Sequence, residues 1–364
     1  MSRLRSGIAV AAALAVLGAT TMTGCSGTAS GASRDTASVA VARRFLDRYV
    51  SASGAVIRRD QGSDTVSEGQ GYALLLAYAA DDRPLFAKVW GWTRTHLQDP
   101  DGLFAYHWQN GAVSSTEPAA DADLQIAWAL DLAGHRWSIP ADTAAARRVA
   151  GSIATAEIGY DDQGHPTLAA GPWAVGSNRP VQVEPGYWTF PADAALATLT
   201  GDHRWRNLSP ADATHLRALS QNGASLPPDW ATIGDGADPA PSPAPQDGTP
   251  AVSGQDGLRA MVWATCLPAT HSLAAKWWKL VAPTAQGGAL TRNLNGTPQT
   301  SGPSPLSLVA AAATARAAGQ MTIMTSLLAR ADRNARQTPT YYGDAWDALG
   351  HILLTTKLIP GCTP

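Results

Sequence analysis

Apolar residues recur at helical spacing along most of the chain from Thr36 onward, as Leu124, Ala127 and Trp128 illustrate. This periodicity predicts twelve helices. Their expected ranges are 36–52, 67–80, 83–97, 121–134, 140–157, 187–199, 209–221, 256–266, 271–282, 304–318, 319–334 and 341–357. Twelve helices taken in consecutive pairs predict an all-α protein of six helical hairpins, which can close into a ring.

Prolines and non-helical stretches mark the expected boundaries. Prolines at or near predicted helix starts, where the missing N–H is harmless, are Pro84, Pro140, Pro210 and Pro305. Strand patterns are weak, and residues 104–108 form the best short candidate. Residues 159–186 and 224–254 are rich in Gly and Pro, and we expect them to form long loops.

The beginning of the chain is typical of an export signal. Arg3 and Arg5 precede a ten-residue apolar run at 8–17, which is too short to span a bilayer comfortably. Met22-Thr23-Gly24-Cys25 resembles the lipobox of bacterial lipoproteins, in which the cysteine is lipidated.

Residues 1–24 are therefore expected to be a lipoprotein signal peptide, with Cys25 attached to the cell membrane on its extracellular face. Secretion after cleavage nearby is the alternative. Residues 25–36 contain mainly Gly, Ser, Ala and Thr and are expected to be a flexible tether. A single catalytic domain is expected at 37–361.

Composition excludes several classes of protein. The 364 residues are 45% apolar, too many for a disordered chain, and carry 27 Lys and Arg against 29 Asp and Glu. A net charge of −2 favours no nucleic acid partner. The eight histidines lack metal-binding spacing, so no metal or cofactor is expected. Export would allow a disulfide between Cys266 and Cys362, with two buried thiols as the alternative.

Acidic residues stand at the start of three predicted helices. They are Glu68 in the first, Asp121 and Asp123 in the second, and Asp256 three residues before Arg259 in the third. Each group alone is explained by helix capping, by the helix dipole or by a local ion pair. In a ring of hairpins, however, the starts of all inner helices meet at one end. Converging carboxylates suit hydrolysis of a glycosidic bond, which needs a general acid and a second carboxylate.

The chain resembles glycoside hydrolase family 8, whose members include endo-β-1,4-glucanases, chitosanases and xylanases. The matching segments, in the family's order, are Ser67-Glu68-Gly69-Gln70, residues 121–127, Glu184-Pro185-Gly186-Tyr187, Leu226-Pro227-Pro228-Asp229-Trp230 and residues 255–259. The resemblance implies an (α/α)6 barrel and inversion of the anomeric centre. It implies Glu68 as general acid, Asp256 as general base and Asp121 as a carboxylate that holds the sugar. Arg259 would orient the base, and Asp123 would bind sugar or only cap its helix.

Several positions depart from the family's usual residues. Ala120 replaces a Ser or Thr, and Gln255 replaces a Tyr beside the base. Glu184 and Gly186 stand where Asn and Ser are usual. All three expected acids remain, so catalysis is still expected.

Electrostatics predict how the acids are arranged. A helix start and Arg259 both favour an ionised Asp256, as a base requires. A helix start should lower the pKa of Glu68, which is wrong for an acid at neutral pH. Burial or a neighbouring charge must raise it, so we expect Glu68 close to Asp121. Inversion predicts about 6.5–9.5 Å between Glu68 and Asp256.

Aromatic side chains complete the expected site. Candidate sugar platforms are Tyr106, Trp108, Tyr187, Trp173 and Trp230, although each alone could be core packing. The sequence thus predicts a monomeric exported hydrolase that cleaves internal β-1,4 bonds of a glucan. Chitosan and xylan are alternative substrates, and a non-catalytic glycan-binding lipoprotein is the alternative from another class.

Overall fold

The computed structural model describes residues 26–175, 180–234, 236–285 and 288–362. The helices in this part of the chain are α1 (Ser26–Tyr49), α2 (Ser67–Ala79), α3 (Arg83–His96), α4 (Ala120–Arg136), α5 (Pro140–Ala156), α6 (Pro172–Val175), α7 (Phe190–Thr200), α8 (His203–Leu219), α9 (Gln255–Trp263), α10 (Pro268–Val281), α11 (Pro305–Ala317), α12 (Met321–Gln337) and α13 (Tyr341–Thr355). Each of the twelve predicted helices is present, and the short α6 is added.

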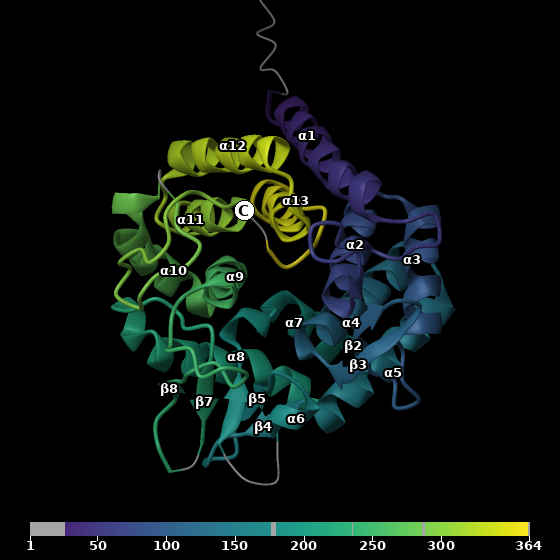
Figure 1. Cartoon of the computed structure of the whole chain (residues 1–364), viewed down its shortest axis with the longest axis horizontal. Helices are drawn as coiled ribbons and strands as arrows, with labels where there is room; N and C mark the ends of the chain where they lie inside the picture. The colour runs from purple at the N-terminus through teal and green to yellow at the C-terminus, as the bar shows by residue number, and fades with distance from the viewer. Residues whose placement is uncertain (1–25, 176–179, 235, 286–287, 363–364) are drawn as a thin grey trace, which may run out of the picture.

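The twelve long helices form two concentric layers. Helices α2, α4, α7, α9, α11 and α13 lie inside, and α1, α3, α5, α8, α10 and α12 surround them (Figure 1). In chain order each outer helix is followed by its inner partner, with α6 inserted between α5 and α7. The prediction of an all-α ring of six hairpins is confirmed.

Side-chain patterns explain which helices lie inside. Every residue of α2 except Glu68 is buried, because this helix is apolar or small around its whole circumference. The outer helix α12 instead buries one stripe, comprising Met324, Leu327, Leu328, Ala331 and Ala335. A one-sided stripe suits a helix with solvent on its other face.

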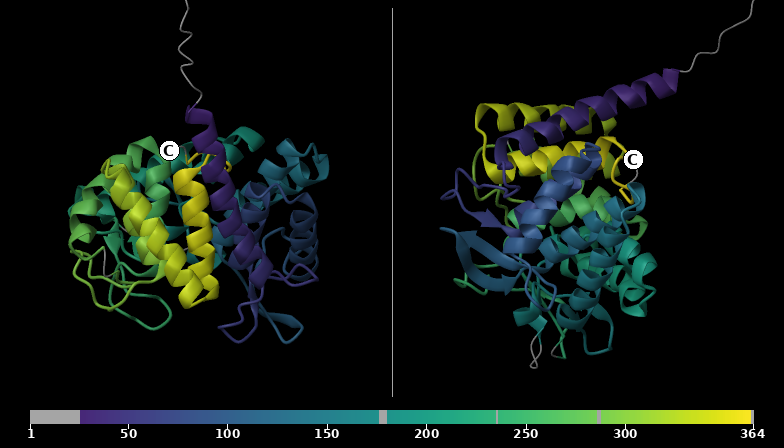
Figure 2. Two further views of the ribbon diagram at one scale, coloured as in Figure 1. Left: turned by 90° about the horizontal axis from the view of Figure 1, so that it is seen from above. Right: turned by 90° about the vertical axis from the view of Figure 1, so that its right-hand side faces the viewer.

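Short strands occupy the connections between the helices. They are β1 (Thr65–Val66), β2 (Ala105–Gln109), β3 (Ala112–Pro118), β4 (Ile158–Tyr160), β5 (Pro166–Leu168), β6 (Val181–Val183), β7 (Ala231–Ile233) and β8 (Ala240–Pro241). They pair antiparallel in the orders β1-β2-β3, β4-β5 and β6-β7-β8. Figure 2 shows strands and long loops gathered toward one end of the helices.

Sequence reasoning found one of these strands and missed the rest. The candidate at 104–108 corresponds to β2, whereas the two stretches expected as loops contain β4 to β8. A signal for β3 was available, because Asn110-Gly111 between β2 and β3 has positive φ at both residues. Asn-Gly is a preferred pair for such a two-residue hairpin turn.

Two helix starts differ most from the expectations. Helix α1 extends back to Ser26, so the segment expected as a tether is helical, and no proline interrupts it. Helix α8 begins at His203 because the Asp202 side chain accepts a hydrogen bond from the Arg204 amide at 2.9 Å. Pro210 therefore lies inside α8 and not near its start, which corrects that prediction.

The C-terminal segment is tied to the barrel. Cys266, the last residue of the 3-10 turn η3 (Ala264–Cys266) that follows α9, forms a disulfide with Cys362, with a sulfur–sulfur distance of 2.06 Å. Of the two options for these cysteines, the structure contains the disulfide. The expected signal peptide at 1–24 and the lipidation site Cys25 lie outside the described residues. Among the described helices, none is long and apolar enough to cross a bilayer.

Candidate active site

Four carboxyl groups surround one buried guanidinium, that of Arg259. Its Nη1 donates hydrogen bonds to Glu68 Oε2 at 3.1 Å and to Asp121 Oδ2 at 2.7 Å. Its Nη2 donates to Asp256 Oδ1 and lies 3.8 Å from Glu184 Oε2. We call these five residues the Arg259 cluster. The three acids proposed from separate segments are thus brought together, and Glu68 lies close to Asp121 as predicted.

The ring of inner helices positions these groups. Glu68 and Asp121 lie in the first turns of α2 and α4, and Asp256 in the first turn of α9. Glu184 directly precedes the 3-10 turn η1 (Pro185–Tyr187), which leads into α7. Helix α13 adds Tyr341 at its first residue, whose hydroxyl donates to Glu68 Oε1 at 3.1 Å. Helix starts distant in sequence therefore meet at one end of the barrel.

Exposure separates the carboxyl groups into two pairs. The side chains of Glu68 and Asp256 are 17% and 22% exposed, whereas those of Asp121 and Glu184 are 2% and 6% exposed. Glu68 and Asp256 can therefore reach a ligand in solution. Asp121 and Glu184 are shielded from solvent.

The pKa of Glu68 suits a general acid. Burial raises this pKa to about 7, the Arg259 guanidinium opposes the rise, and the charges of Asp121 and Asp256 add to it. A helix start alone would have lowered it. Burial also raises the pKa of Asp121, although Arg259 works against that shift. One cation cannot fully compensate four buried carboxylates, so protons are retained in the cluster.

Two glycines permit the close packing around these acids. A Cβ atom at Gly69 would lie 2.7 Å from the Tyr341 hydroxyl oxygen, and one at Gly186 would overlap the Asp256 carbonyl. Gly186, which departs from the family's usual Ser, therefore lets η1 lie directly against the backbone of the expected base.

Asp229 has a role that sequence reasoning missed. Its Oδ1 accepts hydrogen bonds from the amides of Gly254 and Gly257, at 2.6 and 2.7 Å. It thus caps the start of α9 from a distant loop, since the N-cap residue Gly254 has no side chain to do so. Burial and the charge of Asp256 raise the pKa of Asp229 to about 7.

Asp123 does not take either role expected for it. It has no exposed surface, and its Oδ1 accepts the Phe104 amide at 2.8 Å. Burial and the neighbouring charge of Asp123 raise the pKa of the equally buried Glu157. Asp123 thus neither reaches a sugar nor caps α4, because helical periodicity turns it away from Asp121 toward the β2 connection.

The predicted aromatic platforms occupy different places. Tyr106 is 39% exposed, and its hydroxyl feels the charge of Glu68. Trp173 is 41% exposed and lies 6.2 Å from the Trp230 ring. The Tyr187 ring lies under Arg259, 4.9 Å from the guanidinium carbon. These four remain candidate platforms or supports.

Trp108 faces a different neighbourhood. Its ring packs edge-on against Trp92 at 5.8 Å and His96 at 5.0 Å, both on the outer helix α3. Irregular register in β2 places it there although it is two residues from Tyr106. The structure gives Trp108 a packing role at this site.

Two tyrosines in the site were not anticipated. The Tyr72 hydroxyl accepts from Arg259 Nη1 at 3.3 Å, and Tyr341 contacts Glu68 as described. The signals were present, since Tyr72 lies four residues after Glu68 on the same helix face. Tyr341 begins the last inner helix, where the ring argument would have placed a site residue.

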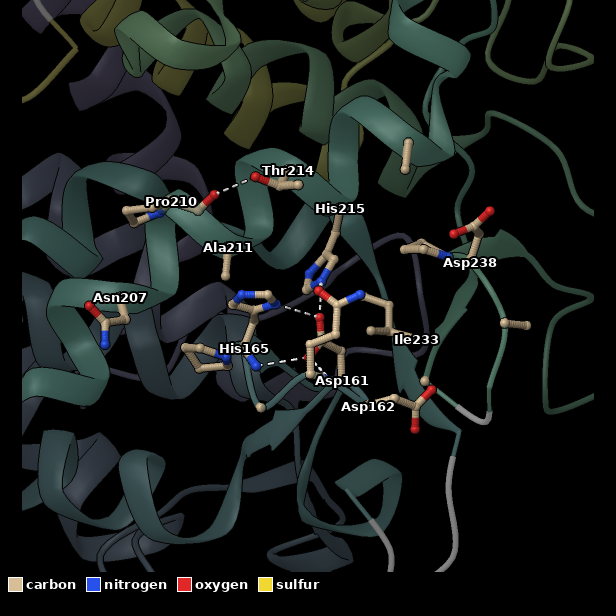
Figure 3. A pocket seen from close by; sticks show the side chains of 17 residues that line it. Asp161, Asp162, His165, Asn207, Pro210, Ala211, Thr214, His215, Ile233 and Asp238 are labelled. Atoms are coloured by element: carbon tan, nitrogen blue, oxygen red, sulfur yellow. Dashed lines mark hydrogen bonds and ion pairs between the residues drawn. The ribbon is translucent and has the colours of Figure 1, made fainter.

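A separate pocket of about 650 Å³ lies beside α8, β5 and β7 (Figure 3). Its Asp161 carboxylate accepts the amides of Gln163 and His165 at 2.9 and 2.8 Å, the His165 ring at 2.9 Å and the His215 ring at 3.4 Å. Although burial opposes it, these bonds lower the pKa of Asp161 to about 2. None of the described residues that line this Asp161 pocket is Phe, Tyr or Trp.

Metal chemistry finds no support in the described part of the chain, where no three His, Cys, Asp or Glu side chains form a metal-binding group. The expectation of a metal-free site stays a prediction.

Comparisons with known proteins agree with the geometry. A "Probable endoglucanase" of Novacetimonas hansenii is 33% identical over 220 residues, 56% of this chain and 61% of the relative. An "Endoglucanase" of Cellulomonas uda is 30% identical over 194 residues, 52% of this chain and 54% of the relative. The matches thus span little more than half the length of these relatives.

A solved structure extends the likeness to nearly the whole chain. The endo-β-1,4-glucanase CMCax of Acetobacter xylinum superposes with a TM-score of 0.74 at 25% identity, over 89% of this chain and 100% of that one. The family description "Glycosyl hydrolases family 8" matches residues 23–355. The chain therefore belongs to glycosyl hydrolase family 8.

Proposed function

We propose that this protein is an inverting hydrolase that cleaves internal β-1,4 bonds of a glucan. The observation that carries the proposal is the Arg259 cluster, in which the partly exposed carboxyl groups of Glu68 and Asp256 contact the two terminal nitrogens of one guanidinium. Glycosidic hydrolysis requires at least two carboxyl groups that a substrate can reach.

Glu68 is the general acid in this mechanism. Its pKa of about 7 leaves it substantially protonated in neutral solution, and its proton passes to the glycosidic oxygen as that bond breaks. The leaving sugar departs with this proton, and Glu68 becomes a carboxylate. The hydroxyl of Tyr341 and the Arg259 guanidinium both contact Glu68 and stabilise the new charge.

Asp256 is the general base. It accepts a proton from a water molecule, whose oxygen bonds to the anomeric carbon from the face opposite the leaving sugar. The net reaction adds one water across one glycosidic bond and inverts the anomeric centre. Asp121, buried beside Glu68, raises the proton affinity of the acid. The family resemblance implies that it also holds the sugar at the cleavage point.

The printed names of the relatives favour glucan as substrate, since the two curated matches and the solved structure are endoglucanases. The exposed Trp173 and the neighbouring Trp230 would support flat sugar faces away from the acids. Chitosan and xylan are the other substrates to test.

The test measures new reducing ends on carboxymethyl cellulose, chitosan and xylan, with the purified protein. Fastest release from the cellulose derivative, with a rapid fall in viscosity, is expected for internal cleavage. Proton NMR of the first products should show the α-anomer. Faster hydrolysis of another polymer would replace the substrate, the β-anomer would overturn inversion, and binding without hydrolysis of any polymer would favour the non-catalytic alternative.

We also propose that the protein is exported and attached to the membrane through Cys25. Support comes from Arg3, Arg5, the apolar run at 8–17 and the lipobox-like residues 22–25. Expression with radiolabelled palmitate should label the wild-type chain and leave Cys25→Ser unlabelled. Equal labelling of both would contradict the proposal, whereas an unlabelled wild type in the medium would indicate simple secretion.

A further inference from the structure

We propose that Glu184 is the positioning residue of the base: it holds a proton and donates a hydrogen bond to the Asp256 carboxylate. The base then enters the reaction as an anion with a fixed orientation. This inference rests on the proposed function, because it assigns Asp256 the role of base.

Contacts around Glu184 carry the first step of the argument. Arg259 Nη2 bonds Asp256 Oδ1 and lies 3.8 Å from Glu184 Oε2, so one guanidinium nitrogen holds the two carboxyl groups side by side. Neighbouring carboxyl groups can share a hydrogen bond only if one of them is protonated. The chain enters this position from β6, and the close packing of Gly186 against Asp256 holds the two segments together. Backbone packing thus keeps the Glu184 and Asp256 carboxyl groups next to each other.

Burial and the position of Arg259 decide which partner carries the proton. Arg259 Nη2 donates directly to Asp256 Oδ1 but lies 3.8 Å from the nearer Glu184 oxygen. Asp256 is 22% exposed and keeps contact with solvent, whereas Glu184 is 6% exposed. A negative charge is therefore better stabilised on Asp256, and the proton resides on Glu184.

The other charged groups facing Glu184 reinforce this assignment. They are Asp121 on α4, Asp256 and Arg259 on α9, and the Tyr187 hydroxyl on η1. Burial raises the pKa of Glu184 well above its usual range, the charges of Asp256 and Asp121 add to the rise, and Arg259 only partly opposes it. Glu184 consequently supplies a neutral donor at the pH where the acid and base work.

Two substitutions separate a neutral donor from a charged or merely space-filling group. Glu184→Gln keeps a neutral N–H donor, so kcat should stay within about threefold of wild type. Glu184→Leu removes the donor, and kcat should fall by about 10- to 100-fold with KM within twofold, as expected for a misplaced catalytic group. The acidic side of its pH profile should also move to higher pH, since the base anion has lost a stabilising donor.

Carbon-13 NMR of the labelled glutamate carboxyl groups tests the proton directly, without activity. The Glu184 resonance, identified by its loss in Glu184→Gln, should have the shift of a carboxylic acid at pH 6. Asp161→Asn, outside the Arg259 cluster, is the matched control and should leave both kcat and this resonance unchanged.

Three results would overturn the proposal: wild-type kcat in Glu184→Leu, an equal loss in Glu184→Gln and Glu184→Leu, or a carboxylate shift for Glu184 at pH 6. If Glu184→Leu does not fold, the kcat of Glu184→Gln and the NMR shift of Glu184 still test whether Glu184 is a neutral donor. If the wild type hydrolyses none of the three polymers, the proposed function fails, while the NMR shift still reports the proton on Glu184.

Discussion

The Arg259 cluster and the Asp161 pocket both place carboxyl groups beside nitrogen donors, yet the pKa of the carboxyl group rises in the cluster and falls in the pocket. In the cluster four carboxyl groups share one cation, and the pKa of Glu68 rises to about 7. In the pocket one carboxylate receives two backbone amides and two histidine rings, and the pKa of Asp161 falls to about 2. Deeper burial of Glu68 and the smaller number of donors for each carboxyl group in the cluster separate the two sites.

This difference shows why a large cavity is a poor guide to chemistry in this protein. The Asp161 pocket has a volume of about 650 Å³, but its carboxylate is already satisfied and stays charged. Such a group cannot deliver a proton near neutral pH. The crowded Arg259 cluster raises the pKa of Glu68 to about 7, and its partly exposed carboxyl groups, Glu68 and Asp256, are in contact with solvent.

The sharpest test of the comparison replaces one carboxylate in each region by its amide. Glu68→Gln should lower kcat by about 10²- to 10⁴-fold, the usual contribution of a general acid, with the thermal unfolding temperature little changed. Asp161→Asn should keep kcat within about twofold. Near-normal turnover in Glu68→Gln, measured from reducing ends, would refute the assigned mechanism.

Removal of the shared cation should produce the next largest effect. Arg259→Met leaves buried carboxyl groups without compensation and should lower the free energy of unfolding at pH 7 by about 3–5 kcal/mol. The loss should be smaller at pH 5, because protonation removes the uncompensated charge. Urea titration measures both values.

Arg336→Met is the matched control, since Arg336 is 57% exposed and bonds Asp332 at 3.0 Å. Its expected cost is at most about 1 kcal/mol. Equal losses for the two arginine variants would show that Arg259 has no special electrostatic role.

The pH dependence of wild-type kcat/KM should reveal the proton held in the cluster. Because Glu68 must be protonated and its pKa is about 7, activity should fall as pH rises through 7, by about tenfold per unit beyond it. Initial rates on a soluble glucan from pH 4 to 9 provide the measurement. A profile flat to pH 9 would be inconsistent with Glu68 as the acid.

The smallest expected effect concerns the Asp161 pocket and stability alone. Asp161→Ala should lower the free energy of unfolding at pH 7 by about 1–2 kcal/mol through lost hydrogen bonds to a charged group. Because the pKa of Asp161 is lower in the folded than in the unfolded protein, its carboxylate stabilises the fold at pH values above the unfolded-state pKa. This stabilisation is lost as pH falls through the folded-state pKa of about 2. The difference in the free energy of unfolding between variant and wild type should therefore become smaller below pH 4. A difference that does not change with pH would contradict this account.

Much of the architecture was predictable because it follows from local periodicity. All twelve long helices were expected, and inner helices such as α2 differ from outer ones such as α12 in ways visible along the chain. Boundaries were less predictable where a side chain extends a helix, as Asp202 does for α8. Most of the strands were missed because two- and three-residue segments carry almost no pattern. The seven-residue β3 was missed although the Asn-Gly turn before it was a recognisable signal.

The candidate site likewise contains residues that the sequence predicted and contacts that only the structure revealed. Glu68, Asp121 and Asp256 stood in recognisable segments at helix starts, and their meeting could be expected from a ring. The turning of Asp123 toward Phe104 and of Trp108 toward Trp92 depends on packing between distant segments. The capping of α9 by Asp229 likewise joins residues 25 and 28 positions apart.

The sequence by itself determined the helical ring and the acids at its helix starts, because periodicity and chain order are local properties. Tertiary structure alone decided how many carboxyl groups share Arg259, how exposed each one is and which of them retain protons. Those properties depend on burial and on charges within a few ångströms, and such neighbours are assembled only when helices far apart in the chain pack together.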